Sequence, residues 1–344
     1  MSEDRMTPKE RFQAFLSGKP MDRFLCVPLI LNHAARISGV KVSEYNRDGR
    51  VMAECHIRAY RRYGHDLITI FSDTAITAEA MGSELHYPED DVPRLERPAV
   101  TDAADLSRLV RATPADGRLP VYLEAIRTAA SAVGDEVPVA CCFMAPFSVA
   151  AMLRGVDMLA RDLYRNKPLA HHLLSLSLEV CKDFADAIID AGGIPIVGDP
   201  VATGSILGER QFREFVLPYL QELHAHIARR GVPPLLHICG QTIRILDAMI
   251  ESGAALLSLD DISMAEARDR AGDKVALMGN VRPAQTLLRG SPEDVLAEVR
   301  SLCSIGRECK SGFILGSGCE VPIGTPPENL EAMLAGVREY GRLS

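Results

Sequence analysis

One histidine and two cysteines have the spacing of metal ligands. The segment LLHICGQT, residues 235–242, places His237 and Cys239 two positions apart at the end of an apolar run. If that run is a β-strand, both side chains point to the same side. The segment FILGSGCEVP, residues 313–322, places Cys319 just after a second apolar run. Imidazole and thiolate ligands together favour Zn²⁺, and three protein ligands leave a fourth position open, as in catalytic zinc sites.

The same residues allow a purely structural interpretation. A lone His-x-Cys pair is weak evidence for a metal, because His237 could be a hydrogen-bonded core histidine and Cys239 a small core side chain. The metal hypothesis therefore depends on whether the fold brings Cys319 to the same place. The remaining cysteines are expected to be buried structural thiols: Cys26, Cys55, Cys141, Cys142, Cys181, Cys303 and Cys309.

Short apolar runs alternate with longer amphipathic stretches along the chain. We predict eight β-strands, each apolar along its whole length, as is typical of parallel strands that are buried on both faces. Eight strands that alternate with helices predict an α/β fold in which the sheet closes into a TIM barrel, with residues 1–344 forming one domain. The ends of the fifth and eighth strands would then face each other across one barrel mouth. The predicted strands span residues 24–30, 66–71, 137–143, 194–199, 234–239, 255–260, 275–280 and 313–318.

Helices are expected over residues 50–63, 167–191, 211–230 and 242–252. Pro218 predicts a kink or break in the third of these. An open doubly wound sheet is the alternative architecture. Its first strand–helix turn is often Gly-rich, whereas the corresponding segment here, LILNHAARISG, has no such turn.

A long connection separates the second and third predicted strands. It contains residues 82–98, GSELHYPEDDVPRLERP, which are rich in proline and charge. We predict that this segment is an insertion near the barrel mouth that forms a hairpin.

Polar side chains collect at the carboxyl ends of the predicted strands, where the active site of a TIM barrel lies. We predict catalytic roles for Asp199 and Asp260, which would orient His237 or fill the fourth metal position during part of the reaction. Asp261 is a further candidate for this role. For Asp199 the alternative is an Asx-type hydrogen bond that caps the next turn. The other polar residues at strand ends are Asn32, His33, Ser72, Asp73, Asn280 and Ser317.

Composition limits the possible partners. The formal net charge is −8, aromatic residues make up 5% of the chain and there is no Trp. A nucleic-acid partner is therefore not expected, because the chain would repel phosphates and offers few rings for base stacking. No apolar run reaches the roughly 18 residues of a membrane-spanning helix, and the charged N-terminal segment does not look like a secretion signal. We expect a cytoplasmic protein.

Six segments together resemble the uroporphyrinogen decarboxylase superfamily over nearly the full length of the chain, and the resemblance implies a TIM barrel. The segments are RFQAFLSGKPMDRFLCVP (11–28), APFSVAAMLRG (145–155), GDPVATGSILGERQFREFVLPY (198–219), LLHICGQTIRILDAMIESGAALLSLDD (235–261), MGNVRPAQTLLRGSPEDV (278–295) and FILGSGCEVPIGTPPENLEAM (313–333).

Two departures from the decarboxylases indicate the branch. The decarboxylases carry Gly-His where this chain has Gly318-Cys319, and they carry an arginine-rich N-terminal motif that grips the porphyrin carboxylates. The corresponding residues 28–38, PLILNHAARIS, contain Arg36 as the only strongly basic side chain. A polyanionic tetrapyrrole would need more cations than this. Decarboxylation is therefore not expected.

The His-x-Cys and late Cys pattern is similar to that of the methylcobalamin:coenzyme M methyltransferases. This resemblance implies that His237, Cys239 and Cys319 bind zinc. It also implies a corrinoid, methylcobalamin, as co-substrate, carried by a corrinoid protein, and a thiol such as coenzyme M as acceptor. Residues 82–98 are our hypothesis for part of the surface that receives the corrinoid protein.

Three alternatives remain open at this point. The first is an O- or N-demethylating methyltransferase that moves a methyl group from a methoxylated aromatic or a methylamine to a corrinoid protein. The second is a decarboxylase-like lyase without metal, and the third is a corrinoid-binding protein without catalytic activity.

Overall fold

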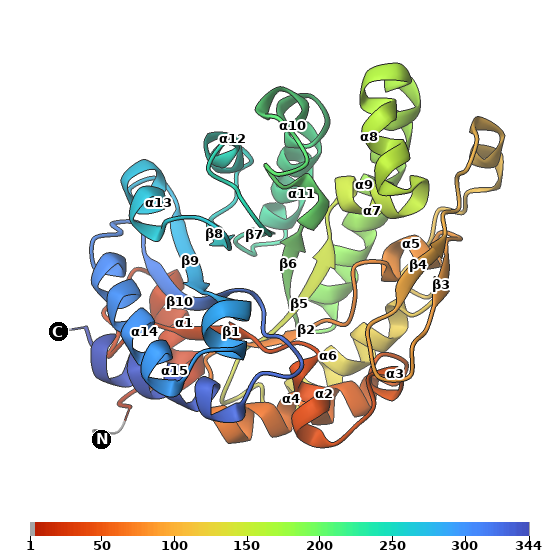
Figure 1. Ribbon diagram of the computed structural model, residues 1–344. Helices are drawn as coiled ribbons and strands as arrows, with labels where there is room; N and C mark the ends of the chain where they lie inside the picture. Colours follow the sequence, from red (N-terminus) through yellow and green to blue (C-terminus); the bar gives the residue numbers. More distant parts are fainter. Residues whose placement is uncertain (1–3, 344) are drawn as a thin grey trace.

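Eight parallel strands form one sheet that curls into a nearly closed barrel (Figure 1). The computed structural model describes residues 4–343. The hydrogen-bonded order is β1-β10-β9-β8-β7-β6-β5-β2. All eight predicted strands are present, and the TIM barrel prediction is confirmed. The strands are β1 (Cys26–Leu29), β2 (Ile68–Ile70), β5 (Val139–Met144), β6 (Ile194–Gly198), β7 (Leu235–Ile238), β8 (Leu256–Leu259), β9 (Ala276–Val281) and β10 (Phe313–Glu320).

Helices surround the barrel because each strand must bury an outer apolar face as well as an inner one. The helices are α1 (Pro8–Leu16), α2 (His33–Ser38), α3 (Val42–Tyr45), α4 (Gly49–Tyr63), α5 (Ile76–Ala80), α6 (Leu119–Val133), α7 (Pro146–Arg154), α8 (Val156–Arg165), α9 (Lys167–Asp190), α10 (Glu209–Phe215), α11 (Leu217–Arg229), α12 (Leu246–Glu251), α13 (Met264–Ala271), α14 (Pro292–Gly306) and α15 (Pro327–Tyr340). Shorter helical turns are η1 (Ala103–Arg108), η2 (Pro200–Ala202) and η3 (Pro283–Leu288).

The helix predictions are confirmed with one correction. Pro218 lies at the start of α11, directly after the break at Val216 that separates α10 from α11. The helix predicted over 242–252 is wrong at its start, because α12 begins only at Leu246. The preceding residues form a turn that carries the chain from the barrel mouth to the outer layer.

The segment 82–98 contains an antiparallel hairpin of β3 (Glu84–His86) and β4 (Arg94–Arg97). The hydroxyl of Tyr87 contacts Arg118 and Glu79, and Arg118 in turn pairs with Asp73 just after β2. These contacts tie the hairpin to the mouth end of the second barrel strand.

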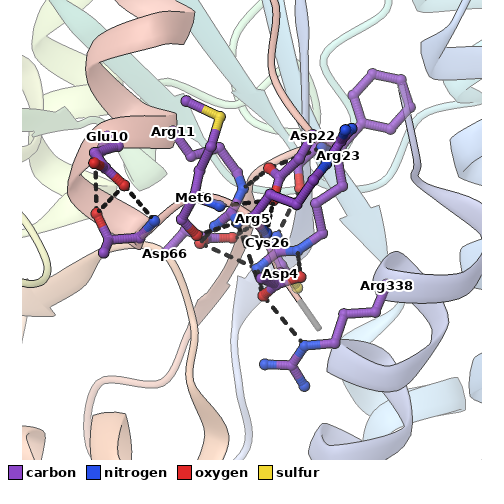
Figure 2. Close-up of polar contacts among 12 residues, drawn as sticks. Asp4, Arg5, Met6, Glu10, Arg11, Asp22, Arg23, Cys26, Asp66 and Arg338 are labelled. Carbon is purple, nitrogen blue, oxygen red and sulfur yellow. Dashed lines mark hydrogen bonds and ion pairs between the residues drawn. The ribbon is translucent and has the colours of Figure 1, made fainter. Parts of the chain in front are cut away.

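A buried ion cluster lies at the opposite end of the barrel, where β1 and β2 begin (Figure 2). Arg11 of α1 donates to Asp22 at 2.7 Å and also pairs with Asp66. Arg23 donates to Asp66 at 2.6 Å. Asp66 accepts from the backbone N–H of Cys26 at 2.7 Å, and its own N–H donates to the Cys26 carbonyl at 2.9 Å. The cluster therefore joins β1 to the start of β2, the two strands at the ends of the hydrogen-bonded order.

Candidate metal centre

His237, Cys239 and Cys319 meet at the barrel mouth. His237 lies in β7, and Cys239 follows that strand directly, so their two side chains share one side as the spacing predicts. Nε2 of His237 lies 3.1 Å from Sγ of Cys239, which lies 3.2 Å from Sγ of Cys319. Among the residues that the structure describes, these three form a group that could hold a metal ion, with all ligand atoms within 4.8 Å of one another.

The location predicted for Cys319 needs a correction. It lies within β10, which extends to Glu320, and not after the strand. Pairing with β1 causes the extension, because Leu29 is opposite Glu320 after an irregularity that places extra residues on β10. The hydroxyl of Ser317 fixes this bulge by accepting from the Leu29 N–H at 2.9 Å and donating to the Cys319 carbonyl at 2.7 Å. A bulge redirects the side chains that follow it, and here it precedes a candidate ligand.

The donor set fits zinc. Two thiol sulfurs and one imidazole nitrogen are the ligand types of a zinc site with three protein ligands. A tetrahedral ion with zinc–sulfur bonds of about 2.3 Å would hold two sulfurs about 3.8 Å apart. The observed sulfurs, 3.2 Å apart, need to separate by about 0.6 Å to reach that distance.

The electrostatics of the three groups favour a cation. The hydrogen bond from Cys239, together with the contact to His237, lowers the pKa of Cys319 below that of an ordinary thiol. The same hydrogen bond and burial raise the pKa of Cys239. Burial acts to lower the pKa of His237, but its contact with Cys319 raises that pKa above the ordinary value. These shifts favour a thiolate at Cys319 beside two groups that carry protons, and a divalent cation can replace such protons.

Ser258 is a site residue that the sequence analysis missed. Its hydroxyl forms a hydrogen bond of 3.0 Å with Nδ1 of His237, the ring nitrogen that faces away from the two sulfurs. The contact follows from strand register, because His237 of β7 pairs with Ser258 of β8. The available signal was a single hydroxyl inside the apolar run ALLSLD. Such a partner orients a ligating imidazole.

Asp260 lies beside the three candidate ligands. Its carboxylate accepts from the Gly240 N–H at 2.8 Å, which fixes the turn directly after Cys239. Gly240 has a φ of 70°, a backbone conformation that glycine adopts without strain. Burial raises the pKa of Asp260, and the Gly240 hydrogen bond opposes that shift. Asp261 is exposed and does not belong to the group of three candidate ligands.

The structure does not bring Asp199 to the three ligands. Its carboxylate accepts from the Ser148 N–H at 3.0 Å and from the Ser148 hydroxyl at 2.6 Å, at the beginning of α7. Its other oxygen is buried without a hydrogen-bond partner. Burial raises the pKa of Asp199 to about 7. Asp199 therefore contacts the first turn of α7, and its link to His237 is through the backbone, since its N–H donates to the His237 carbonyl at 2.9 Å.

The remaining polar residues at strand ends make structural contacts. His33 is a buried histidine between Tyr63 and the Ile323 carbonyl, at 3.0 and 3.1 Å. Asn280 donates to the carbonyls of Asp260 and Ile262 and so shapes the loop after β8. Ser72 donates to Asp73, and Asp73 pairs with Arg118.

Glu320, next to Cys319, is the second residue that the sequence analysis missed. It accepts from the Asn32 side chain at 2.8 Å, and burial raises its pKa to about 7. An acidic residue directly after a candidate cysteine ligand was visible in the sequence, but its direction depends on the bulge in β10.

A cavity of about 110 Å³ opens beside the candidate ligands, inside the barrel mouth. His237, Cys239 and Cys319 form part of its wall, and so does Glu320. The rest is mostly apolar and comes from strands all around the barrel. Examples of these apolar residues are Leu29, Phe71, Met144, Ile196, Leu235 and Met278.

Fold and site together define a TIM barrel with a candidate three-ligand zinc centre at its mouth. The chain belongs to the uroporphyrinogen decarboxylase (URO-D) family, which matches residues 7–340.

Relatives in this family carry more than one activity in their names. The methylcobamide:CoM methyltransferase MtaA of Methanosarcina barkeri is 29% identical over 351 residues, which is 99% of each chain. A uroporphyrinogen decarboxylase of Nitrosomonas europaea is 29% identical over 327 residues, covering 88% of this chain and 90% of that protein. The solved structure of a methyltransferase from Methanosarcina mazei has a TM-score of 0.89 and 25% identity, covering 98% of this chain and 99% of that one.

In the part of the chain that the structure describes, no helix has the length and apolar character needed to cross a membrane.

Proposed function

We propose that this protein is a zinc-dependent methyltransferase that moves a methyl group between a corrinoid and a thiol. The observation that carries the proposal is the convergence of His237, Cys239 and Cys319 on one point of the barrel mouth. The chain is a methyltransferase of the branch that includes its relatives named methylcobamide:CoM methyltransferase. A porphyrin substrate is disfavoured because the described residues that line the cavity include no Arg or Lys to pair with its carboxylates.

The residues of this chain prepare the reaction in three ways. His237, Cys239 and Cys319 would hold zinc with one position open toward the cavity. Zinc bound there would lower the pKa of a substrate thiol, so that the sulfur enters the reaction as a thiolate. Ser258 keeps the His237 ring oriented, and the apolar wall excludes water from the reacting atoms.

The chemical step is a displacement at the methyl carbon. The sulfur–carbon bond forms while the cobalt–carbon bond of the methylcorrinoid breaks, and the bonding electron pair stays on cobalt. The thiol proton is released to solvent before the step. The cofactor carries the difficult chemistry, and the barrel supplies orientation.

We further propose that the corrinoid arrives on a carrier protein that docks over the carboxyl ends of the strands. The β3–β4 hairpin is the part of the chain that we assign to this docking, because Tyr87 ties it to the mouth end of β2. Asp260 would serve the reaction by fixing the turn after Cys239, and Asp199 by its contacts with α7.

Zinc analysis tests the proposal directly. Purified wild-type protein should contain about one zinc per chain, as a three-ligand catalytic site requires. Cys239→Ala and Cys319→Ala should lose most of the zinc. Cys142→Ala removes a neighbouring thiol of the same cavity wall that is not among the three ligands, so it should keep its zinc. Equal zinc in all four proteins would show that the site is elsewhere.

Activity is then followed by the absorbance of cobalamin. The reaction mixture contains methylcobalamin and a thiol, and the measured product is demethylated cobalamin. The wild-type protein and Cys142→Ala should form this product at a rate well above that of the zinc-free variants. A rate that does not depend on zinc would contradict the proposal.

A further inference from the structure

The charge on the cavity wall distinguishes among possible substrates. Of the seventeen described residues that line the cavity, none is Lys or Arg. The wall does contain one acidic side chain, Glu320, and the carboxylate of Asp260 lies 2.8 Å from the backbone nitrogen of Gly240, directly after Cys239. A molecule that brings an anionic group into this space would find acidic neighbours and no cation to pair with.

Two arginines at the mouth end of the barrel are already engaged in ion pairs. Arg118 approaches the segment after β2, next to the lining residue Thr74, but it pairs with Asp73 at 2.8 Å and with Glu79 at 2.7 Å. Arg282, which follows β9, pairs with Glu298. Neither guanidinium can turn to an anion in the cavity without leaving a carboxylate unpaired, which is costly for the buried Arg118–Asp73 pair.

One hydroxyl of the wall has no partner. Thr69 of β2 is 4% exposed, and its Oγ1 has no hydrogen bond in the structure. A buried hydroxyl without a partner carries a desolvation cost that a ligand with a neutral polar atom removes. The wall thus offers a largely apolar surface in which the buried hydroxyl of Thr69 is free to bind a neutral polar atom.

We propose that the methyl-exchanging substrate is an uncharged, largely apolar organic molecule and not an anionic thiol such as coenzyme M. This inference rests on the proposed function, because the substrate is taken to react at the zinc held by His237, Cys239 and Cys319. The sulfonate of coenzyme M would be buried without a counter-ion, and burying an unpaired charge is strongly unfavourable.

Two kinds of molecule share this chemistry. An alkyl or aryl thiol would accept the methyl group from the corrinoid through its sulfur, with the atom balance given above. A methoxylated aromatic would instead donate its methyl to cobalt(I), whose electron pair forms the cobalt–carbon bond while the oxygen leaves as a phenolate that takes up a proton. Turnover with each kind, followed by cobalamin absorbance, distinguishes these two sources.

Binding is tested with matched ligands on the protein as purified. Titration calorimetry compares 1-butanethiol with 2-mercaptoethanesulfonate, and ligand-observed NMR measures binding of anisole, which has no thiol. We expect butanethiol to bind at least tenfold more tightly than the sulfonate and anisole to bind at millimolar concentration or below. Equal or tighter binding of the sulfonate would overturn the proposal.

An added cation provides the decisive variant. Thr74→Lys places an ammonium group on the cavity wall and should bind the sulfonate about tenfold more tightly than Thr74→Met does. Thr74→Met is the control of similar length without charge, and it should not improve sulfonate binding. The inference is wrong if Thr74→Lys binds the sulfonate no more tightly than Thr74→Met does and both bind it as tightly as butanethiol. Charge would then not select the substrate.

The outcomes separate this inference from the proposed function. A protein that contains no zinc but binds anisole in the cavity would refute the zinc methyltransferase and support the inference on the cavity. A protein that contains zinc and methylates 2-mercaptoethanesulfonate faster than butanethiol would support the methyltransferase and refute the inference.

Discussion

Replacing Ser258 with alanine would remove the hydroxyl that lies 3.0 Å from Nδ1 of His237. Both side chains are buried, at 3% and 7% exposure, so water is not in place to substitute for the lost hydrogen bond. Losing a buried hydrogen-bond partner costs about 1–3 kcal/mol. The partner of a metal-ligating histidine accounts for about 10–100-fold in metal affinity. We therefore expect Ser258→Ala to weaken zinc binding by about 10–100-fold.

Competition with a chromophoric zinc chelator measures this change. The matched control is Ser177→Ala, because Ser177 is equally buried in α9 and its hydroxyl has no hydrogen-bond partner. The control should bind zinc as the wild type does. If Ser258→Ala also keeps wild-type affinity while circular dichroism shows an intact fold, the hydroxyl does not orient His237 and the reasoning about the site fails.

Three other predictions concern stability and the partner. Arg11→Met should lower the free energy of unfolding by about 3–5 kcal/mol, because it leaves Asp66 short of a buried partner. Urea denaturation measures this change. The control is Arg50→Met, which should change the free energy of unfolding by less than about 1 kcal/mol because the pair of Arg50 with Glu124 is exposed. The raised pKa of Asp199, about 7, means that its contribution to stability is complete below pH 3.8 and is lost as the pH rises to about 7. Asp199→Asn should therefore flatten the fall in urea midpoint between pH 5 and 8, and an unchanged slope would contradict a buried carboxyl of this pKa. Shortening the hairpin turn at residues 88–92 should slow methyl transfer from a corrinoid protein at least tenfold more than transfer from free methylcobalamin, and equal losses would remove the hairpin from the docking surface.

Strand identity was predictable because parallel barrel strands are apolar on both faces. The runs around Val27, Leu236 and Leu315 read as strands without any knowledge of their neighbours, and each is fully buried. The helix break just before Pro218 was predictable for an equally local reason, since proline lacks the N–H that a continuous helix needs.

The candidate site was predictable only in part. His237 and Cys239 are close in sequence, so strand geometry alone aligns them. The direction of Cys319 depends on a bulge that exists only because Leu29 pairs with Glu320. Ser258 lies in the site because of the register between β7 and β8, and Glu320 because of the same bulge in β10. The local sequence pattern predicts neither the register nor the bulge. Asp199 has the residue type and strand position of a catalytic acid, but Ser148 on the neighbouring α7 holds its carboxyl group.

The pairing of β1 with β10 sets a condition on how the protein is made. The N–H of Leu29 bonds to Ser317 across 288 positions of sequence. During synthesis β1 emerges early, but its hydrogen-bonded neighbour β10 is the last strand of the sheet to be made. One edge of the growing sheet therefore stays open to wrong partners until the last strand leaves the ribosome. That same strand carries Cys319, so barrel closure and completion of the ligand set occur in one event, and a chain still in synthesis cannot yet hold zinc with all three ligands.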